Sequence, residues 1–355
     1  MRLKRWLVRC IFLLSGLGLG SCQAIGDFFT LPPTEPWLTP SELAVIVNEA
    51  DPLSVQIGEY YQQQRRIPAR NLIRVRFNPE QTVLSPEEFE QVFALVNAKI
   101  PPYTQAFALT WAVPYRVGCM SITSAFAFGF DSRYCAEGCQ PTKPSPYYKS
   151  NSIQPHSDLK VRPAMAIAAT SFEQAKALID RGIAADYSAP KGTAYLVSTS
   201  DASRNVRANL YAPVSQYLGG RFAIQQVKAD SLTNKPDVMF YFTGLAQVRQ
   251  LDSNRFLPGA IADHLTSAGG MLTDSGQMSS LRWLEAGATG SYGAVVEPCN
   301  FVQKFPQPGI VIYYYLQGET LLEAYWKSVA WPGQGIFIGE PLARPFGNPN
   351  RHGSS

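Results

Sequence analysis

The sequence predicts an α/β fold, a mostly parallel β-sheet with helices on both of its faces. Three observations lead to this class. Short apolar runs alternate with longer amphipathic segments between residues 43 and 339. Most of these runs are apolar at successive positions, as in strands that are buried on both faces of a parallel sheet. Helix-start signals stand between successive runs, so that crossover helices can connect parallel strands.

The first half of the domain shows this alternation most clearly. Pro52 suits the first turn of a helix, and Ser85 with Glu88 forms a capping box at the start of another. The expected elements are strands at 43–48, 71–77 and 106–113 and helices at 51–66 and 85–99. Residues 117–160 then interrupt the pattern with a Cys-rich loop insertion of little periodicity.

The alternation resumes after the insertion and continues to the end of the domain. Apolar runs predict a strand that opens at 290 and others at 164–170, 192–198, 222–227, 238–244, 269–273 and 335–339. The intervening segments predict helices from 171 and near 202–218, 258–266, 277–286 and 318–331. We expect one α/β domain over 41–346, or two α/β halves over about 41–185 and 186–346.

The first 22 residues predict a lipoprotein signal peptide. A basic start precedes the apolar stretch 11–19 and the sequence Leu-Gly-Ser-Cys, which resembles a bacterial lipobox ending at Cys22. The apolar stretch is too short and too rich in Gly for a membrane-spanning helix. We therefore expect lipid on Cys22, a Pro-rich tether over 23–40 and a disordered tail over 347–355. The alternative for the leader is an ordinary cleaved signal with a chance cysteine.

Charge argues against two classes of partner. The chain has 31 Lys and Arg against 27 Asp and Glu, but four of the basic residues belong to the leader, so the mature chain is formally neutral. Neutrality gives no support to nucleic acid or an acidic membrane surface as a partner. We expect an exported protein of the bacterial cell envelope that contacts the membrane through its lipid anchor only. The sequence identifies no ligand or protein partner.

Four of the six cysteines remain once Cys10 leaves with the leader and Cys22 carries lipid. The remaining set is Cys119, Cys135, Cys139 and Cys299. An even number in an exported chain favours disulfides, and four cysteines allow three pairings. No Cys or His stands at metal-ligand spacing from the Cys135–Cys139 pair, so we expect no metal. The sequence "GATGSYG" is not a dinucleotide fingerprint, and we expect no cofactor.

Polar residues that follow the strands form the candidate site, because open parallel sheets bind ligands beyond the carboxyl ends of their strands. If the strands run parallel, these residues meet at one edge. The candidate binding residues are Asp51, Tyr115, Arg116, Thr243 and Asn300. The candidate catalytic residues are Asp274, Ser275, Gln277, Glu297 and Cys299. The insertion starts at the same edge and either covers it as a lid or forms a disulfide-pinned surface loop.

His264 is excluded as a partner for Cys299 by the predicted elements. The expected helix at 258–266 leads to the start of the strand at 269, which places His264 near the amino-terminal edge of the sheet. A five-residue strand spans about 16 Å, far more than the roughly 3 Å between a nucleophile and its base. We therefore expect His264 to be structural and to bond a backbone carbonyl. His156, in the insertion, could reach the candidate edge.

The C-terminal half resembles the caspase-like domain of gingipain-type cysteine peptidases. The matching order is "VMFYFTG", a helix, "GGMLTDSG", a helix, "GATGSYGAVVEP", a helix and "IFIGEPLARPF". Where those peptidases have His-Gly this chain has Thr243-Gly244, and where they have the catalytic Cys it has Asp274-Ser275. The resemblance implies a caspase-like topology without the peptidase dyad. Through "VIVNEADPLSVQIGEYYQQQRRIPARNL" and "TWAVPYRVGC", the whole chain also resembles a bacterial family of exported proteins, which implies no activity.

Cys299 has three interpretations: a disulfide partner, a buried free thiol, or a nucleophile served by His156 or a carboxylate. We favour a disulfide to the insertion, because the envelope is oxidising and the insertion emerges at the same predicted edge. The preferred arrangement bonds Cys135 to Cys139 and leaves Cys119 for Cys299.

The leading hypothesis for function is a lipid-anchored envelope protein with a binding or scaffolding role. One alternative is a cysteine peptidase that uses Cys299. The other is a hydrolase at the edge that carries Asp274, Ser275 and Glu297, with Asp274 and Glu297 as acid and base.

Overall fold

The computed structural model describes residues 37–136 and 138–348. The predicted signal peptide, the lipidation site Cys22, most of the tether and the end of the tail lie outside the described residues. Within the described ranges, the helices are all too short or too polar to cross a bilayer.

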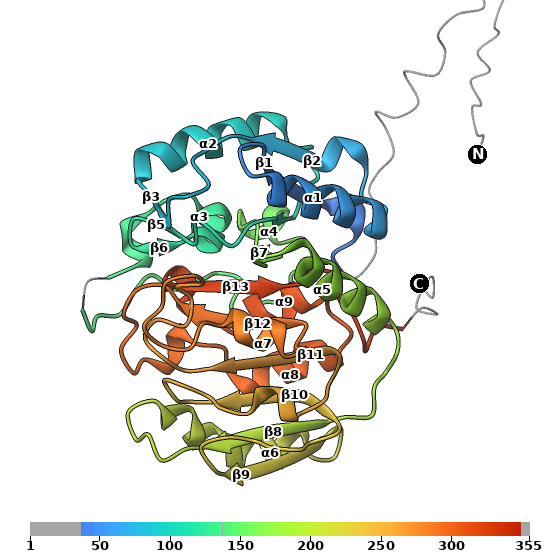
Figure 1. Ribbon diagram of the computed structural model, residues 1–355, viewed down its shortest axis with the longest axis vertical. Coiled ribbons are helices and arrows are strands. Elements are labelled where there is room, and N and C mark those ends of the chain that lie inside the picture. The colour runs from blue at the N-terminus through green and yellow to red at the C-terminus, as the bar shows by residue number, and fades with distance from the viewer. Residues whose placement is uncertain (1–36, 137, 349–355) are drawn as a thin grey trace, which may run out of the picture. The chain divides into compact units, whose positions relative to one another are not determined.

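Ten strands form the central sheet. They are β1 (Leu43–Asn48), β2 (Leu72–Val75), β4 (Ala106–Leu109), β7 (Ala164–Ala166), β8 (Thr193–Ser198), β9 (Ala223–Lys228), β10 (Val238–Thr243), β11 (Phe256–His264), β12 (Gly290–Ala294) and β13 (Gly335–Gly339). Their order across the sheet is β2-β1-β4-β7-β13-β12-β11-β10-β8-β9 (Figure 1). Neighbouring strands are parallel except β12 and β13. The predicted fold class, a mostly parallel α/β sheet, is confirmed.

Helices cover both faces of this sheet. In the described residues they are α1 (Pro52–Arg65), α2 (Pro86–Lys99), α3 (Ile122–Phe128), α4 (Pro155–Leu159), α5 (Phe172–Ala185), α6 (Tyr211–Leu218), α7 (Leu281–Glu285), α8 (Pro308–Leu316) and α9 (Leu321–Trp326). Successive side chains of β10 point to opposite faces: Tyr241 packs on Trp283 of α7, and Phe240 packs on Tyr315 of α8. Figure 1 accordingly shows α5 and α7 in front of the sheet and α8 behind it.

Local signals place the first two helices where the sequence predicts them. Pro52 opens α1, and the Asp51 carboxylate accepts a hydrogen bond from the Leu53 N–H at 2.9 Å. Ser85 and Glu88 form the expected capping box at the start of α2. Both helix starts are confirmed.

The segment 256–264 departs most from the predicted elements, because it is strand β11 and not a helix. Pro258 and Gly259 lie where the pairing of β11 with β10 shifts register between Val238 and Phe240. The strand therefore bulges around a proline that has no N–H for the ladder. The run 269–273, which we expected to be a strand, belongs to the irregular connection from β11 to α7.

The insertion is more ordered than its sequence suggests. It contributes α3 and two strands of a small second sheet, which consists of β3 (Val83–Leu84), β5 (Arg116–Val117) and β6 (Met120–Ser121). The Ser121 hydroxyl donates to the Gly335 carbonyl at 2.6 Å, and the Ser124 hydroxyl donates to the Pro332 carbonyl at 2.8 Å. These bonds fix the insertion against the start of β13.

Candidate functional site

The antiparallel contact between β12 and β13 divides the strand ends between two opposite edges of the sheet. The carboxyl ends of β1, β4, β7 and β13 lie at one edge, and those of β8, β10, β11 and β12 lie at the other. The expectation of a single edge is therefore wrong, because it treated every strand as parallel. Asp51 follows β1 at the first edge, where it caps α1. Thr243 ends β10 at the second edge.

The second edge is closed by the chain segment that follows β8. Arg207 and Asp263 form an ion pair at 2.5 Å, and both side chains are 1% exposed. Arg207 also donates to the Thr243 carbonyl at 2.6 Å. A Cβ on Gly244 would lie 1.8 Å from the carbonyl oxygen of Arg204, so this segment passes directly over the end of β10. Parallel sheets often bind ligands here, but in this protein the chain itself fills the place.

His264 ends β11 at this second edge, so its predicted position at the opposite edge is wrong. The error follows from reading 258–266 as a helix. The Trp283 indole N–H donates to His264 Nδ1 at 2.9 Å, which leaves the proton on Nε2 for a 3.0 Å bond to the Met278 carbonyl. Burial lowers the pKa of His264 to about 3. The imidazole is thus neutral, fully bonded and structural, as we expected.

The three candidates between β11 and α7 form hydrogen bonds within their own loop or with Tyr115, which lies just before the insertion. Asp274 is exposed and accepts a 2.7 Å bond from the Tyr115 hydroxyl, whose pKa is raised to about 12 mainly by burial. The Ser275 hydroxyl accepts from the Gln277 N–H at 3.0 Å. The Gln277 side-chain oxygen accepts from the Thr266 hydroxyl at 2.6 Å. These bonds hold the loop and link it to Tyr115, just before the insertion.

The candidates beyond β12 lie on an exposed turn. The Glu297 carboxylate accepts the Cys299 N–H at 2.7 Å, and Asn300 is exposed beside it. Among the described residues, no hydrogen bond joins Glu297 to Asp274, the proposed acid–base pair. Arg116, the remaining candidate, is half-buried on β5, and its Nε has no hydrogen-bond partner among the described residues.

Two disulfides fix the insertion. They join Cys119 to Cys135 and Cys139 to Cys299. The prediction that Cys299 bonds to the insertion is confirmed, but the preferred pairing is wrong. Cys135 is buried with the core while Cys139 is exposed, so these two near neighbours in sequence do not face each other. A cysteine held in a disulfide offers no thiolate, which removes the nucleophile from the candidate site.

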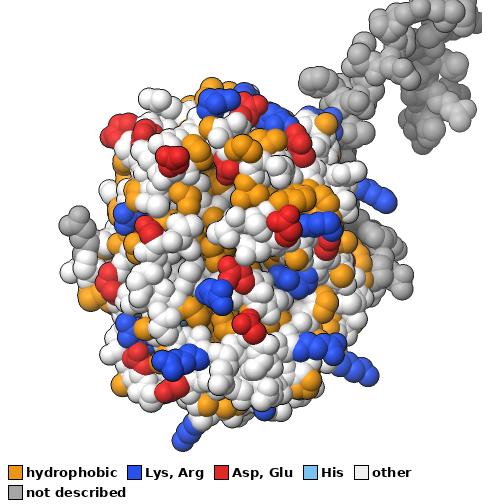
Figure 2. All heavy atoms as spheres, in the orientation of Figure 1, with side chains coloured by type: hydrophobic (Ala, Val, Ile, Leu, Met, Phe, Trp, Pro, Cys, Tyr) orange, Lys and Arg blue, Asp and Glu red, His pale blue; other side chains and the backbone are white. Residues whose placement is uncertain are grey.

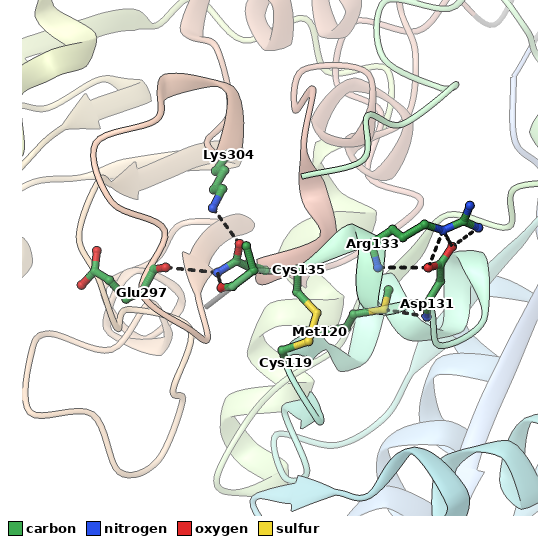
Figure 3. Close-up of a disulfide and its surroundings, with 9 residues drawn as sticks. Cys119, Met120, Asp131, Arg133, Cys135, Glu297 and Lys304 are labelled. Atoms are coloured by element: carbon green, nitrogen blue, oxygen red, sulfur yellow. Dashed lines mark hydrogen bonds and ion pairs between the residues drawn. A yellow bond between two sulfur atoms is a disulfide. The ribbon is translucent and has the colours of Figure 1, made fainter. Parts of the chain in front are cut away.

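Lys304 is a buried lysine near the turn that follows β12. It belongs to no sequence motif, and the sequence did not identify it as a site residue. The Lys304 amine donates to the Gln334 side-chain oxygen at 2.7 Å, and Gln334 in turn donates to the Glu297 carbonyl at 3.1 Å (Figure 3). Burial lowers the pKa of Lys304 to about 8, against the attraction of the Glu297 carboxylate. Lys304 is 1% exposed, so the amine ties the turn after β12 to Gln334, just before the start of β13, and is not available to a ligand.

A groove with mostly apolar walls lies between α6 and α8, on the face of the sheet opposite α7. Its volume is about 460 Å³. The lining residues are Lys149, Leu210, Pro213, Val214, Tyr217, Leu218, Gln307, Gly309, Ile310, Tyr313 and Tyr314. Tyr217 is 70% exposed at its rim. No sequence motif predicts this groove, because its walls come from helices that are far apart in the chain.

Similar solved structures include two that cover most of this chain. The structure of a protease matches with a TM-score of 0.48 and 10% identity, over 87% of this chain and 79% of the other. The complex of the pro- and mature domains of Porphyromonas gingivalis RgpB, a gingipain, matches with a TM-score of 0.41 and 9% identity, over 86% and 80%. No family model and no curated protein matches the chain. The two likenesses concern the fold alone, and the resemblance to a family of exported proteins stays a prediction.

Proposed function

We propose that this chain is a lipid-anchored protein of the bacterial cell envelope whose domain binds a partner and does not cleave peptide bonds. One observation carries the proposal: the thiol at the candidate edge is bonded to Cys139, and the imidazole there is bonded at both nitrogens. Cysteine peptidases require a free thiolate with a base in hydrogen-bond reach. Neither group is free here.

The finding that residues 256–264 form strand β11, and not a helix, strengthens the proposal. β10 ends at Thr243 and is followed by Gly244, and β11 ends at His264 and is followed by Leu265. Asp274-Ser275, which the resemblance set at the position of the catalytic cysteine, lies ten residues further on in the β11–α7 connection. Neither assignment supplies a thiol. The proposal of a domain without the dyad therefore does not depend on which one is used.

The alternative of a hydrolase with Asp274 and Glu297 has less support. Each carboxylate is exposed and accepts a local hydrogen bond, from Tyr115 and from the Cys299 N–H respectively. Neither carboxylate lines the α6/α8 groove. An acid and a base that act on one bond must lie around a common substrate position.

The α6/α8 groove is the surface that we assign to partner binding. Its walls are apolar and aromatic, and Lys149 supplies the charge among its lining residues. This chemistry fits a peptide segment of a partner protein with apolar side chains and an acidic residue that meets Lys149. Synthetic aliphatic peptides flanked by Glu should bind better than the same peptides flanked by Lys. Lys149→Glu should reverse this preference, and Lys191→Glu, an exposed site outside the groove, should leave it unchanged.

Envelope location and lipidation rest on the leader and on the two disulfides, which are typical of oxidising compartments. Figure 2 shows acidic and basic side chains interspersed over one face of the domain, in keeping with a formally neutral mature chain. Cell fractionation of Cys22→Ser against the native chain tests the anchor. Release of the variant from the membrane fraction is the expected result, and unchanged membrane retention without fatty-acid labelling of the native chain would refute it.

The absence of hydrolysis is tested with purified protein against peptide, ester and glycoside substrates. We expect no turnover above background. Turnover that disappears in Asp274→Asn and Glu297→Gln but persists in Ser275→Ala would overturn the binding proposal in favour of acid–base hydrolysis. Turnover that disappears in Cys299→Ala alone would favour the peptidase.

A further inference from the structure

The two outermost strands of the ten-stranded sheet, β2 and β9, differ in how their free backbone groups are protected. At one edge, β2 has four residues, and the Lys99 ammonium of α2 donates to the Arg74 carbonyl at 3.0 Å. At the other edge, β9 has six residues without a proline, and its side chains are exposed or half-buried throughout. Edge strands present unpaired backbone groups, and stable monomers cover or charge them. The β9 edge has neither protection among the described residues, apart from Lys228 at its end.

The printed register shows which backbone groups of β9 are free. The Ala229 N–H donates to the Ser198 carbonyl, so position 229 faces β8. Alternation along a strand makes 223, 225 and 227 face β8 as well, and the parallel pairing of β8 with β9 covers this whole stretch. The N–H and C=O groups of Ile224, Gln226 and Lys228 therefore point away from the sheet.

We propose that β9 pairs with β9 of a second copy of this chain, antiparallel and about a twofold axis at Gln226. The two sheets then join into one continuous sheet across the axis. The inference concerns assembly, so it goes beyond the proposed binding role and stands whether or not that role is correct. Figure 1 shows β9 at the free lower end of the sheet, at the opposite end from β2.

This register is self-complementary in its hydrogen bonds. Gln226 faces Gln226 of the second copy, and Ile224 of each copy faces Lys228 of the other. In an antiparallel ladder each such pair exchanges both of its N–H···O bonds, so every outward group of β9 is satisfied. A twofold arrangement uses one patch on both copies, which is the commonest form of homo-oligomer.

Charge and side-chain size are also compatible with this pairing. Each Lys228 lies opposite an isoleucine, and the two lysines are four residues apart along the ladder, about 13 Å. That distance exceeds the Debye length of about 8 Å at physiological ionic strength, so their repulsion is largely screened. On the α6 face, the Gln226 amide donates to the Ser215 hydroxyl at 2.9 Å. Ala212 and Gly219 share the helical side of Ser215 and are exposed, which leaves room for α6 of the second copy.

The first test measures the mass of the full chain in detergent solution by light scattering. We expect twice the chain mass for the native protein and for Gln226→Ala. Gln226→Pro should be monomeric, because it removes an outward N–H and no bond to β8. Circular dichroism checks that the proline variant keeps its fold. A monomeric native protein, or a dimer that survives in a folded Gln226→Pro variant, would overturn the proposal.

Cysteine cross-linking tests the register in the envelope and does not depend on the proline variant. Gln226→Cys should give a cross-linked dimer, because position 226 meets itself at the axis. Lys228→Cys alone should not cross-link, whereas co-expressed Ile224→Cys and Lys228→Cys chains should. Cross-linking of Lys228→Cys with itself, or none at Gln226→Cys, would contradict the register.

Discussion

Acidification should destabilise this protein through His264, and the size of the effect follows from its surroundings. The imidazole is buried between the Trp283 indole and the Met278 carbonyl, and burial lowers its pKa from 6.5 to about 3. Above pH 6.5, both the native and the unfolded states hold a neutral ring. Between pH 6.5 and about 3 the unfolded chain takes up a proton that the native state refuses, so the free energy of unfolding falls as the pH falls.

The expected loss is about 2 kcal/mol at pH 5 and approaches about 5 kcal/mol near pH 3, since one pKa unit corresponds to about 1.36 kcal/mol. A typical domain has only about 5–15 kcal/mol of stability, so the effect is large. His156, whose pKa burial lowers to about 4, adds to the same window. The native chain must therefore be compared with a variant that differs at position 264 only.

Urea unfolding between pH 7 and pH 4 provides the assay, with His264→Asn as the variant. Asparagine can still accept from Trp283 but does not titrate. The variant is expected to be less stable at pH 7 and to lose about 2 kcal/mol less than the native chain on going to pH 5. Parallel curves for the two proteins would mean that His264 titrates normally, and would refute its assignment as a buried, neutral residue.

Three further variants test the packing. Cys139→Ala with Cys299→Ala opens a link between residues 160 apart in sequence, and the chain-entropy model predicts a loss of up to about 5 kcal/mol in urea unfolding; a loss below about 1 kcal/mol would count against the bridge. Arg207→Met leaves Asp263 buried without its partner and should cost about 3–5 kcal/mol in the same assay, and an unchanged midpoint would show that the pair is open to water. Gly270→Ala places a Cβ 2.4 Å from a backbone carbonyl of β12, so its melting temperature should drop by several degrees by circular dichroism, and an unaltered melting curve would contradict the close approach.

The parts of the fold that the sequence predicts well are those that depend on local chemistry. Asp51 with Pro52 and Ser85 with Glu88 are complete helix-start signals within four residues, and the structure uses both. The buried strands β1 and β13 have the predicted bounds, because a short apolar run between turns has few other places in an α/β fold.

The direction of β13 could not be predicted from its sequence. An apolar strand buried on both faces has the same pattern whichever way it runs, so "GIFIG" gives no sign that it is antiparallel to β12. That one reversal divides the candidate residues, which we expected at a single edge, between two opposite edges. The prediction for the segment around Pro258 and Gly259 was wrong for a different reason. These residues signal a helix start or a break, and only the pairing with β10 shows that they form a bulge.

Prediction of the candidate site from the sequence was limited because the site depends on contacts between residues far apart in the chain. An even cysteine count predicts two bridges, but the pairing depends on which side chain faces the core, and Cys135 does while Cys139 does not. The α6/α8 groove and the free edge of β9 arise from elements that meet only in the folded chain. No local pattern encodes either surface.

The state of Cys299 in the native protein tests the central claim most directly. Protein isolated from the envelope is treated with iodoacetamide without reduction, digested, and mapped by mass spectrometry, while hydrolytic activity is measured before and after treatment. The account predicts a linked peptide pair that contains Cys139 and Cys299, no alkylation at Cys299, and no activity to lose. Stoichiometric alkylation of Cys299 that abolishes a measurable hydrolysis would contradict it.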